Sequence, residues 1–179
     1  MDTTVKTIAV VRDAPSDAVQ TLFHDLVEGW QGSARIAGVL AEGHGLEGRR
    51  CNAGFLRSIR DGRRYPIFQD LGAGSQACQL DGRGASEASE AIRRDIEDGC
   101  DLVVLSKFGK LEAAREGLMP AFAAAVEAGV PVLTSVSPAF REAWDRFAEP
   151  LIVALPLERD AIDAWWRSVR NAAPSAAHA

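Results

Sequence analysis

The sequence predicts a three-layer α/β sandwich with a mainly parallel central sheet. Short apolar runs alternate along the chain with amphipathic helical segments, a pattern typical of sheets covered by helices on both faces. Residues 101–105 (DLVVL) are continuously apolar after the first position, which indicates a strand buried on both faces at the centre of the sheet. The dipeptide Asp61-Gly62 is a strong hairpin signal, so we expect a β-hairpin inserted after the second strand.

The composition indicates one globular domain. The chain has 179 residues and is 47% hydrophobic, and we expect a domain over residues 1–171 and a frayed tail over residues 172–179. The net charge of −5 argues against a broad surface for nucleic acid. No apolar run approaches the roughly 20 residues that span a bilayer, and the N-terminus enters a strand without signal-peptide architecture. We therefore expect a cytoplasmic protein without membrane insertion.

The three cysteines indicate reduced thiols. Cys51, Cys78 and Cys100 are odd in number, widely spaced and without a CxxC pair. This pattern suits a reducing compartment better than disulfides or a zinc site.

The first half of the chain gives two strands, a helix and the hairpin. Residues 6–11 (KTIAVV) predict a strand, and Ser16 or Asp17 is expected to cap a helix that runs to about residue 30. Residues 36–40 (IAGVL) predict the second strand. The hairpin strands are expected over the ranges 50–59 and 65–69.

The second half continues the alternation without an internal repeat. We expect helices over residues 85–98, 118–128, 138–147 and 158–169, and strands over residues 101–105, 131–136 and 151–155. Gly99 and Gly129 follow two of these helices, as glycine commonly does at a helix C-terminus. Trp144, Trp165 and Trp166 lie in C-terminal helices, as packing residues or as the face of a homodimer.

A polar segment follows the predicted central strand. Ser106, Lys107, Gly109 and Lys110 form a loop in this prediction, and ligands of open α/β sheets bind beyond the carboxyl ends of strands. Two lysines beside a serine and a glycine are well placed to bind an anion. The alternative is that both lysines are solvated surface charges, and the spacing leaves the two interpretations open.

A second loop is a candidate for the same ligand. Residues 69–84 lack periodicity and contain four glycines, and a loop of this length is usually functional or disordered. Gly72 and Gly74 let successive backbone N–H groups point into one concavity, a nest for anions. The other candidate residues of this loop are Gln69, Asp70 and Ser75. The alternative is a flexible surface loop.

We expect the two loops to converge. Right-handed crossovers bring loops from neighbouring strands together at the carboxyl edge of a parallel sheet. Lys107, Lys110 and the range 72–75 would then form one anion pocket, with Arg115 close by.

Glu112 is the candidate for catalysis. It can act as a base or hold a metal, or it can pair with Lys110 or Arg115, which is the commoner outcome. Glu112 and Glu116 are four residues apart, so a helix would place them on one face. No Ser/His/Asp or Cys/His nucleophile set is present in the sequence.

The first strand-to-helix junction is where a nucleotide-binding fold would place its phosphate loop. This junction has no glycine and no Lys-Ser/Thr pair. Arg12 and Ser16 at a helix N-terminus can attract an anion, whereas Asp13 and Asp17 would repel it. The sequence favours a plain capped helix start.

Three segments carry a resemblance to a known family. QDLGAGSQACQLD, DLVVLSKFGKLEAAREG and AGVPVLTSV resemble a bacterial family of uncharacterised proteins whose genes commonly lie beside molybdate-transport genes. The resemblance covers roughly residues 7–147. It implies a link to molybdenum, with molybdate-transport or molybdenum-cofactor proteins as partners.

The order of elements is also similar to the small P-loop nucleoside triphosphatases first described from thermophiles. That resemblance implies a P-loop-NTPase-like fold with an inserted hairpin, in which the strand after the hairpin carries an Asp-Glu-x-Gly-x-Met-Glu motif. Gly109 and Glu112 match this motif, but Ser106 and Lys107 replace its acidic pair.

These observations favour a non-catalytic or weakly catalytic binding or regulatory protein. Its expected ligand is an oxyanion (molybdate, sulfate or phosphate) or a nucleotide, because all present similar oxygens to N–H donors. The alternatives are a nucleoside triphosphatase with a degenerate phosphate loop and an interaction partner without a small ligand.

Overall fold

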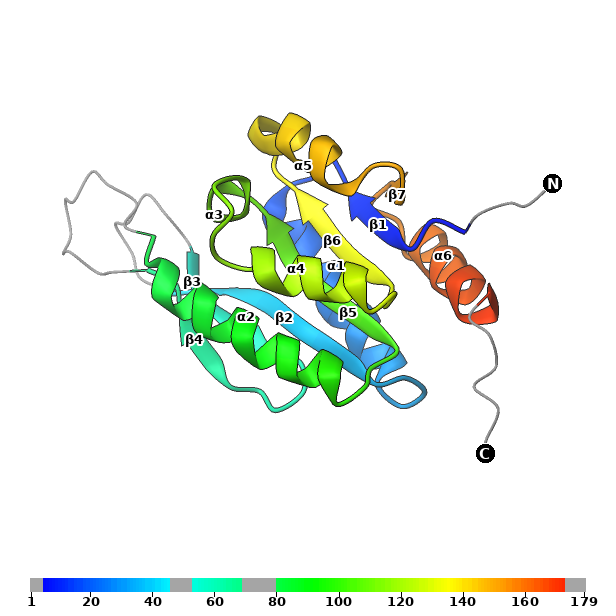
Figure 1. Cartoon of the computed structure of the whole chain (residues 1–179), viewed down its shortest axis with the longest axis horizontal. Coiled ribbons are helices and arrows are strands. Elements are labelled where there is room, and N and C mark those ends of the chain that lie inside the picture. Colours follow the sequence, from blue (N-terminus) through cyan, green and yellow to red (C-terminus); the bar gives the residue numbers. More distant parts are fainter. Residues whose placement is uncertain (1–4, 46–52, 69–79, 173–179) are drawn as a thin grey trace.

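The computed structural model describes residues 5–45, 53–68 and 80–172, and in it helices cover both faces of one seven-stranded sheet (Figure 1). The strands are β1 Ile8–Val11, β2 Ile36–Gly43, β3 Ala53–Ser58, β4 Arg64–Pro66, β5 Leu102–Phe108, β6 Val132–Val136 and β7 Ile152–Leu155. The helices are α1 Ser16–Trp30, α2 Gly82–Glu97, α3 Lys110–Ala113, α4 Met119–Glu127, α5 Arg141–Ala148 and α6 Arg159–Ala172, with a 3-10 turn η1 at Pro138–Phe140.

The sheet order confirms the predicted fold class. The strands lie in the order β4-β3-β2-β5-β6-β1-β7, and all pairings among β2, β5, β6, β1 and β7 are parallel. The β3–β4 hairpin adds two antiparallel strands at one edge, and Gly62 in its turn has a φ of +74°. β5 lies at the centre, as the apolar run predicts.

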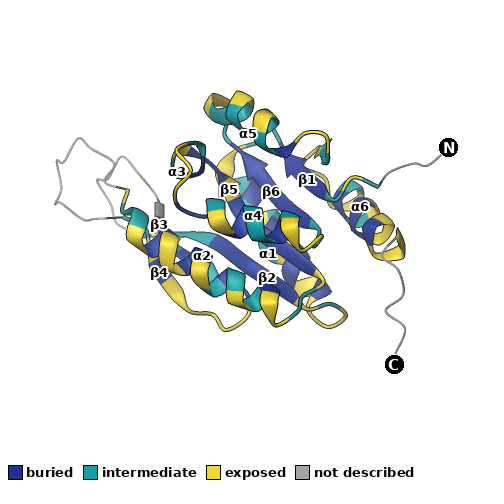
Figure 2. Ribbon diagram, viewed as in Figure 1, coloured by how far each residue is buried: buried dark blue, intermediate teal, exposed yellow. Residues whose placement is uncertain are grey.

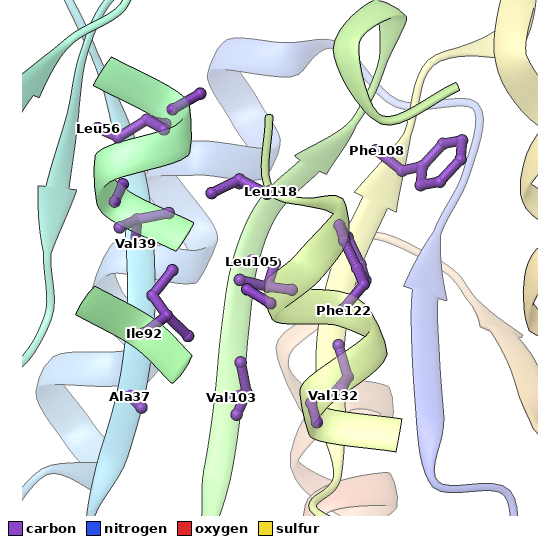
Figure 3. Close-up of a cluster of buried hydrophobic side chains, with 14 of the residues drawn as sticks. Ala37, Val39, Leu56, Ile92, Val103, Leu105, Phe108, Leu118, Phe122 and Val132 are labelled. Carbon is purple, nitrogen blue, oxygen red and sulfur yellow. The ribbon is translucent and has the colours of Figure 1, made fainter. Parts of the chain in front are cut away.

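Two apolar layers hold the helices on the sheet. On one face, Val103 and Leu105 of β5 pack in a cluster with residues of α2 and α4 (Figure 3). The same cluster includes residues of α5. On the other face, Leu102 and Val104 pack in a cluster with residues of α1 and α6. β5 and β6 are accordingly buried while the helices expose their outer faces (Figure 2). Within the described residues, no helix combines the length and apolarity that crossing a bilayer requires.

β5 runs three residues further than predicted. Leu105 pairs with Thr134 and Phe108 pairs with Val136, so three steps on β5 match two steps on β6. This is a β-bulge, in which one extra residue is accommodated in one strand. The prediction that residues 106–110 form a loop is therefore wrong, because Ser106 and Lys107 belong to the bulged strand. The bulge also turns Phe108 onto the same face of the sheet as Leu105.

Two local predictions are wrong. α1 begins at Ser16 after Pro15, and no side chain caps it, so neither Ser16 nor Asp17 is the N-cap. α3 ends at Ala113, so Glu116 does not share a helix face with Glu112. The helix stops because Arg115 and the glycine two residues later both adopt positive φ angles, +64° and +60°.

Candidate functional site

A polar network fixes the carboxyl end of β5. The backbone carbonyl of Ser106 accepts hydrogen bonds from Gln20 Nε2 at 3.0 Å and from Ser135 Oγ at 2.9 Å. Gln20 Oε1 also accepts from the Ala41 N–H at 3.1 Å, so one α1 side chain joins β2 to β5. The regular pairing of β2 with β5 ends at Val39 and Leu105, where the two strands separate. The hydrogen bonds of Gln20 and Ser135 satisfy backbone groups that this separation and the bulge in β5 leave without a strand partner.

The Glu112 carboxylate organises the segment that follows. It is 7% exposed; Oε2 accepts the Gly109 N–H and Oε1 accepts the Leu118 N–H, each at 3.0 Å. A Cβ on Gly117 would lie 2.6 Å from Oε1, so the chain needs glycine there. Glu112 forms no ion pair with Lys110 or Arg115, and a role as base would compete with its backbone bonds.

Four cationic side chains near this segment lack partners. In the described ranges, Lys107, Lys110, Arg115 and Arg146 have no hydrogen bond, ion pair or ring contact from their side chains, and all four are exposed. Every other lysine or arginine described has a hydrogen-bond acceptor, a carboxylate or an aromatic ring as its partner. Three of the four belong to the sequence-predicted site, and Arg146 lies on α5.

A cavity of about 540 Å³ lies beside the end of β5. Its lining comes from the end of β5, from α3 and the turn after it, and from α4 and α5. The lining residues are Phe108, Glu112, Ala113, Arg115, Met119, Ala143, Arg146 and Phe147. We call this cavity the β5 pocket, and it places Arg115 and Arg146 beside two phenylalanines.

The β1–α1 junction is bridged to α5 by two ion pairs. Arg12 Nη2 donates to Asp145 Oδ1 at 2.5 Å, and Arg141 pairs with Asp13. Ser16 is exposed at the start of α1. Arg12 is thus engaged with a carboxylate at the place where a phosphate loop would lie.

Several predicted site residues lie outside the described residues. These are Gln69, Asp70, Gly72, Gly74 and Ser75. The convergence of their loop with Lys107 and Lys110 therefore stays a prediction. Cys51 and Cys78, which are not among the predicted site residues, also lie outside the described residues.

The remaining candidates for chemistry are a thiol and one exposed cluster. Cys100 is free, and burial raises its pKa to about 11. Among the described residues, the side chains of His24, Asp25 and Glu28 lie close enough to share a metal ion, but all are exposed on α1, where acidic groups commonly gather without an ion. Neither feature adjoins the β5 pocket lining.

Arg146 cannot be identified as a site residue from the sequence, because its place in the site depends on tertiary packing. Arg146 reaches the site only because α5 packs beside the end of β5, and nothing local in residues 141–148 indicates that contact. Its spacing from Ala143 places both on one helix face, but helical spacing does not show which element that face meets.

Comparison with known proteins places the chain in a family. Residues 8–165 match the family model described as Protein of unknown function (DUF2478). The chain belongs to this family. The DUF2478 chain is also 36% identical over 165 residues to "Molybdenum import ATP-binding protein ModC 2" from Bradyrhizobium diazoefficiens. That match covers 92% of this chain and 18% of the relative, so the chain spans less than a fifth of the relative's length.

A solved structure confirms the fold. THEP1 from the hyperthermophile Aquifex aeolicus matches with a TM-score of 0.53 and 13% sequence identity, covering 90% of this chain and 95% of THEP1. The predicted P-loop-NTPase-like α/β architecture is therefore confirmed. Identity at this level shows the fold alone.

Proposed function

We propose that this DUF2478 protein is a non-catalytic or weakly catalytic binding and regulatory module for an oxyanion or a nucleotide in molybdate handling. The observation that carries the proposal is the group of unpartnered cations, Lys107, Lys110, Arg115 and Arg146. In a chain with a net charge of −5, the other described cations are engaged while these four remain available. Lysine and arginine form charge-assisted hydrogen bonds to oxyanions that are about twice as strong as neutral ones.

The bridged junction after β1 supports a binding role over hydrolysis. Phosphoryl transfer needs groups that hold Mg²⁺ and stabilise the charge on the transferred phosphate. Here Arg12 and Asp13 are engaged with α5, and Ser106 and Lys107 stand where acidic residues would be expected. We expect ATP and GTP turnover below roughly 1 per second, the low end of typical enzymes. A faster rate that is lost on Glu112→Gln would contradict this.

The identity to a molybdenum import ATP-binding protein supports the molybdate link. The matched stretch is 18% of that relative, so a segment similar to this chain forms part of a protein named for molybdenum import. We propose that the present protein acts beside a molybdate importer or a molybdenum-cofactor protein and regulates that partner when the ligand is bound. The similarity to the import protein therefore favours interaction with such a partner as the second candidate function.

Calorimetric titration with molybdate, sulfate and ATP tests the proposal. Lys107→Ala and Lys110→Ala are each expected to weaken binding about tenfold, because each removes one charge-assisted hydrogen bond. Arg167→Ala on α6 is the matched control, since its guanidinium donates to the Asp163 carbonyl of its own helix. Equal affinities in the wild type and both lysine variants would contradict the proposal.

A further inference from the structure

We infer that the β5 pocket binds an aromatic phosphate, a flat ring system carrying a phosphate group, rather than an inorganic oxyanion alone. The inference rests on the proposed function and names the ligand class for one part of that site. It concerns the space between β5, the α3–α4 turn and α5, and it is separate from the phosphate-loop position after β1.

The volume of the pocket exceeds what a small oxyanion needs. Allowing about 30 Å³ per oxygen, the volume of a water in the liquid, a four-oxygen anion takes up about 120 Å³. The pocket measures about 540 Å³, within the range of roughly 300–1,000 Å³ found for sites of organic ligands. Most of the space would remain for another part of the ligand.

The walls indicate that this other part is apolar and flat. Phe108, Met119 and Phe147 line the pocket, and aromatic and thioether side chains contact rings favourably. Phe108 and Phe147 lie nearly parallel, with ring centroids 6.3 Å apart and an interplanar angle of 18°. Trp144 backs both rings, with centroids 5.3 Å from Phe108 and 6.0 Å from Phe147. This cluster holds the aromatic wall in place before any ligand binds.

The charge of the pocket indicates a phosphate. Arg115 and Arg146 reach it from two different walls, the turn after α3 and helix α5. A guanidinium presents a planar fork of donors that matches phosphate oxygens. Glu112 is the acidic residue among the lining, and both of its oxygens accept backbone N–H bonds. The two arginines therefore dominate the charge that a ligand meets.

The backbone at Arg115 adds a second observation. Its φ of +64° lies in the left-handed region, which is unfavourable for a residue other than glycine. Strain of this kind persists where surrounding structure imposes it, commonly at ligand-binding positions. A glycine would adopt the same turn without strain, so this position keeps an arginine beside the pocket at a conformational cost.

Ala143 provides the most selective test of ring binding. Ala143, Arg146 and Phe147 lie at i, i+3 and i+4 on one face of α5, and the small alanine leaves room beside the ring of Phe147. Ala143→Leu fills that room without altering any charge. Ala164→Leu is the matched control, because Ala164 is exposed on α6.

Titration with two aromatic phosphates, 1-naphthyl phosphate and AMP, decides the matter, with inorganic phosphate and adenosine as references. We expect both aromatic phosphates to bind at least tenfold more tightly than either reference. Arg146→Ala should weaken their binding about tenfold, and Ala143→Leu should reduce the preference for AMP over inorganic phosphate by at least tenfold. Arg167→Ala and Ala164→Leu should retain wild-type values.

The inference is overturned if inorganic phosphate binds as tightly as AMP. It is equally overturned if Ala143→Leu and Arg146→Ala keep wild-type affinity for both aromatic phosphates. Should Ala143→Leu fail to fold by circular dichroism, Arg146→Glu at the exposed surface of α5 decides in its place, with loss of AMP binding expected. Failure of the proposed function is seen separately, as inorganic-anion affinity that is insensitive to Lys110→Ala.

Discussion

Replacing Glu112 by glutamine separates a structural role for this carboxylate from a catalytic one. Glu112 accepts backbone N–H bonds from Gly109 and Leu118, one on each oxygen. A glutamine of the same shape can accept only one of them. Its amide NH₂ group would face the other N–H donor, so that backbone group would lose its partner in a buried position.

The magnitude follows from these two bonds. A hydrogen bond to a charged group contributes about 1.5–3 kcal/mol, and an unsatisfied buried donor costs about 1–3 kcal/mol. The two quantities describe overlapping losses, so we expect Glu112→Gln to lower the free energy of unfolding by about 2–3 kcal/mol. In a chain of this length that corresponds to a fall in Tm of roughly 5–10 °C.

Urea denaturation followed by circular dichroism is the assay. Glu116→Gln is the control, because Glu116 is exposed in the same segment and its side chain forms no hydrogen bond or ion pair within the described residues. We expect the control to remain within about 0.5 kcal/mol of the wild type. A Glu112→Gln midpoint equal to that of the control would refute the structural role.

Four further predictions concern backbone strain and a half-buried thiol. Gly117→Ala should destabilise the protein by at least about 1 kcal/mol more than Gly129→Ala. Both glycines have positive φ, but only a Cβ at position 117 would lie against Glu112 Oε1. Equal denaturation midpoints would contradict this. Arg115→Gly should leave the free energy of unfolding unchanged or raise it by up to about 1 kcal/mol while weakening AMP binding, and a marked loss of stability would be the opposite result. In a variant whose other cysteines are serine, Cys100 should react with iodoacetamide at pH 8 about 100-fold more slowly than an ordinary thiol. The reason is that burial raises the pKa of Cys100 from 9.0 to about 11. Alkylation at the rate of a model peptide would contradict this. The same raised pKa makes the free energy of unfolding depend on pH. The contribution of the protonated thiol should be fully present below pH 9 and lost as the pH rises through 11.

Sequence periodicity was sufficient for the fold because burial imposes it directly. Residues 102–105 must be apolar on both sides to lie between two helix layers, and the burial of Leu102, Val103, Val104 and Leu105 confirms this. The Asp61-Gly62 signal likewise depends only on the local need for positive φ at Gly62.

The end of β5 was predicted less well because its form depends on distant partners. Ser106 and Lys107 are polar, so the sequence predicts a loop there. The register with β6 and the hydrogen bonds that Gln20 and Ser135 donate to the Ser106 carbonyl instead keep them in a bulged strand. No local pattern contains that information.

The same reason applies to the site. The sequence identifies Glu112 as a candidate site residue. Its hydrogen bond from the N–H of Leu118, however, depends on two turn residues with positive φ, which the sequence pattern does not predict. Arg146 joins Arg115 only through the placement of α5 beside β5.

An amide chemical-shift titration with molybdate and with AMP tests the central claim most directly, since it locates the anion site on the chain. We predict saturable shifts in residues 107–119 and 143–147, around the unpartnered cations and the β5 pocket. Amides in residues 12–18, after β1, should shift less than these, because only the ion pairs of Arg12 and Asp13 with α5 connect them to the site. Shifts concentrated in residues 12–18, or no saturable shift with either ligand, would contradict the claim that this protein binds anions at the carboxyl end of β5.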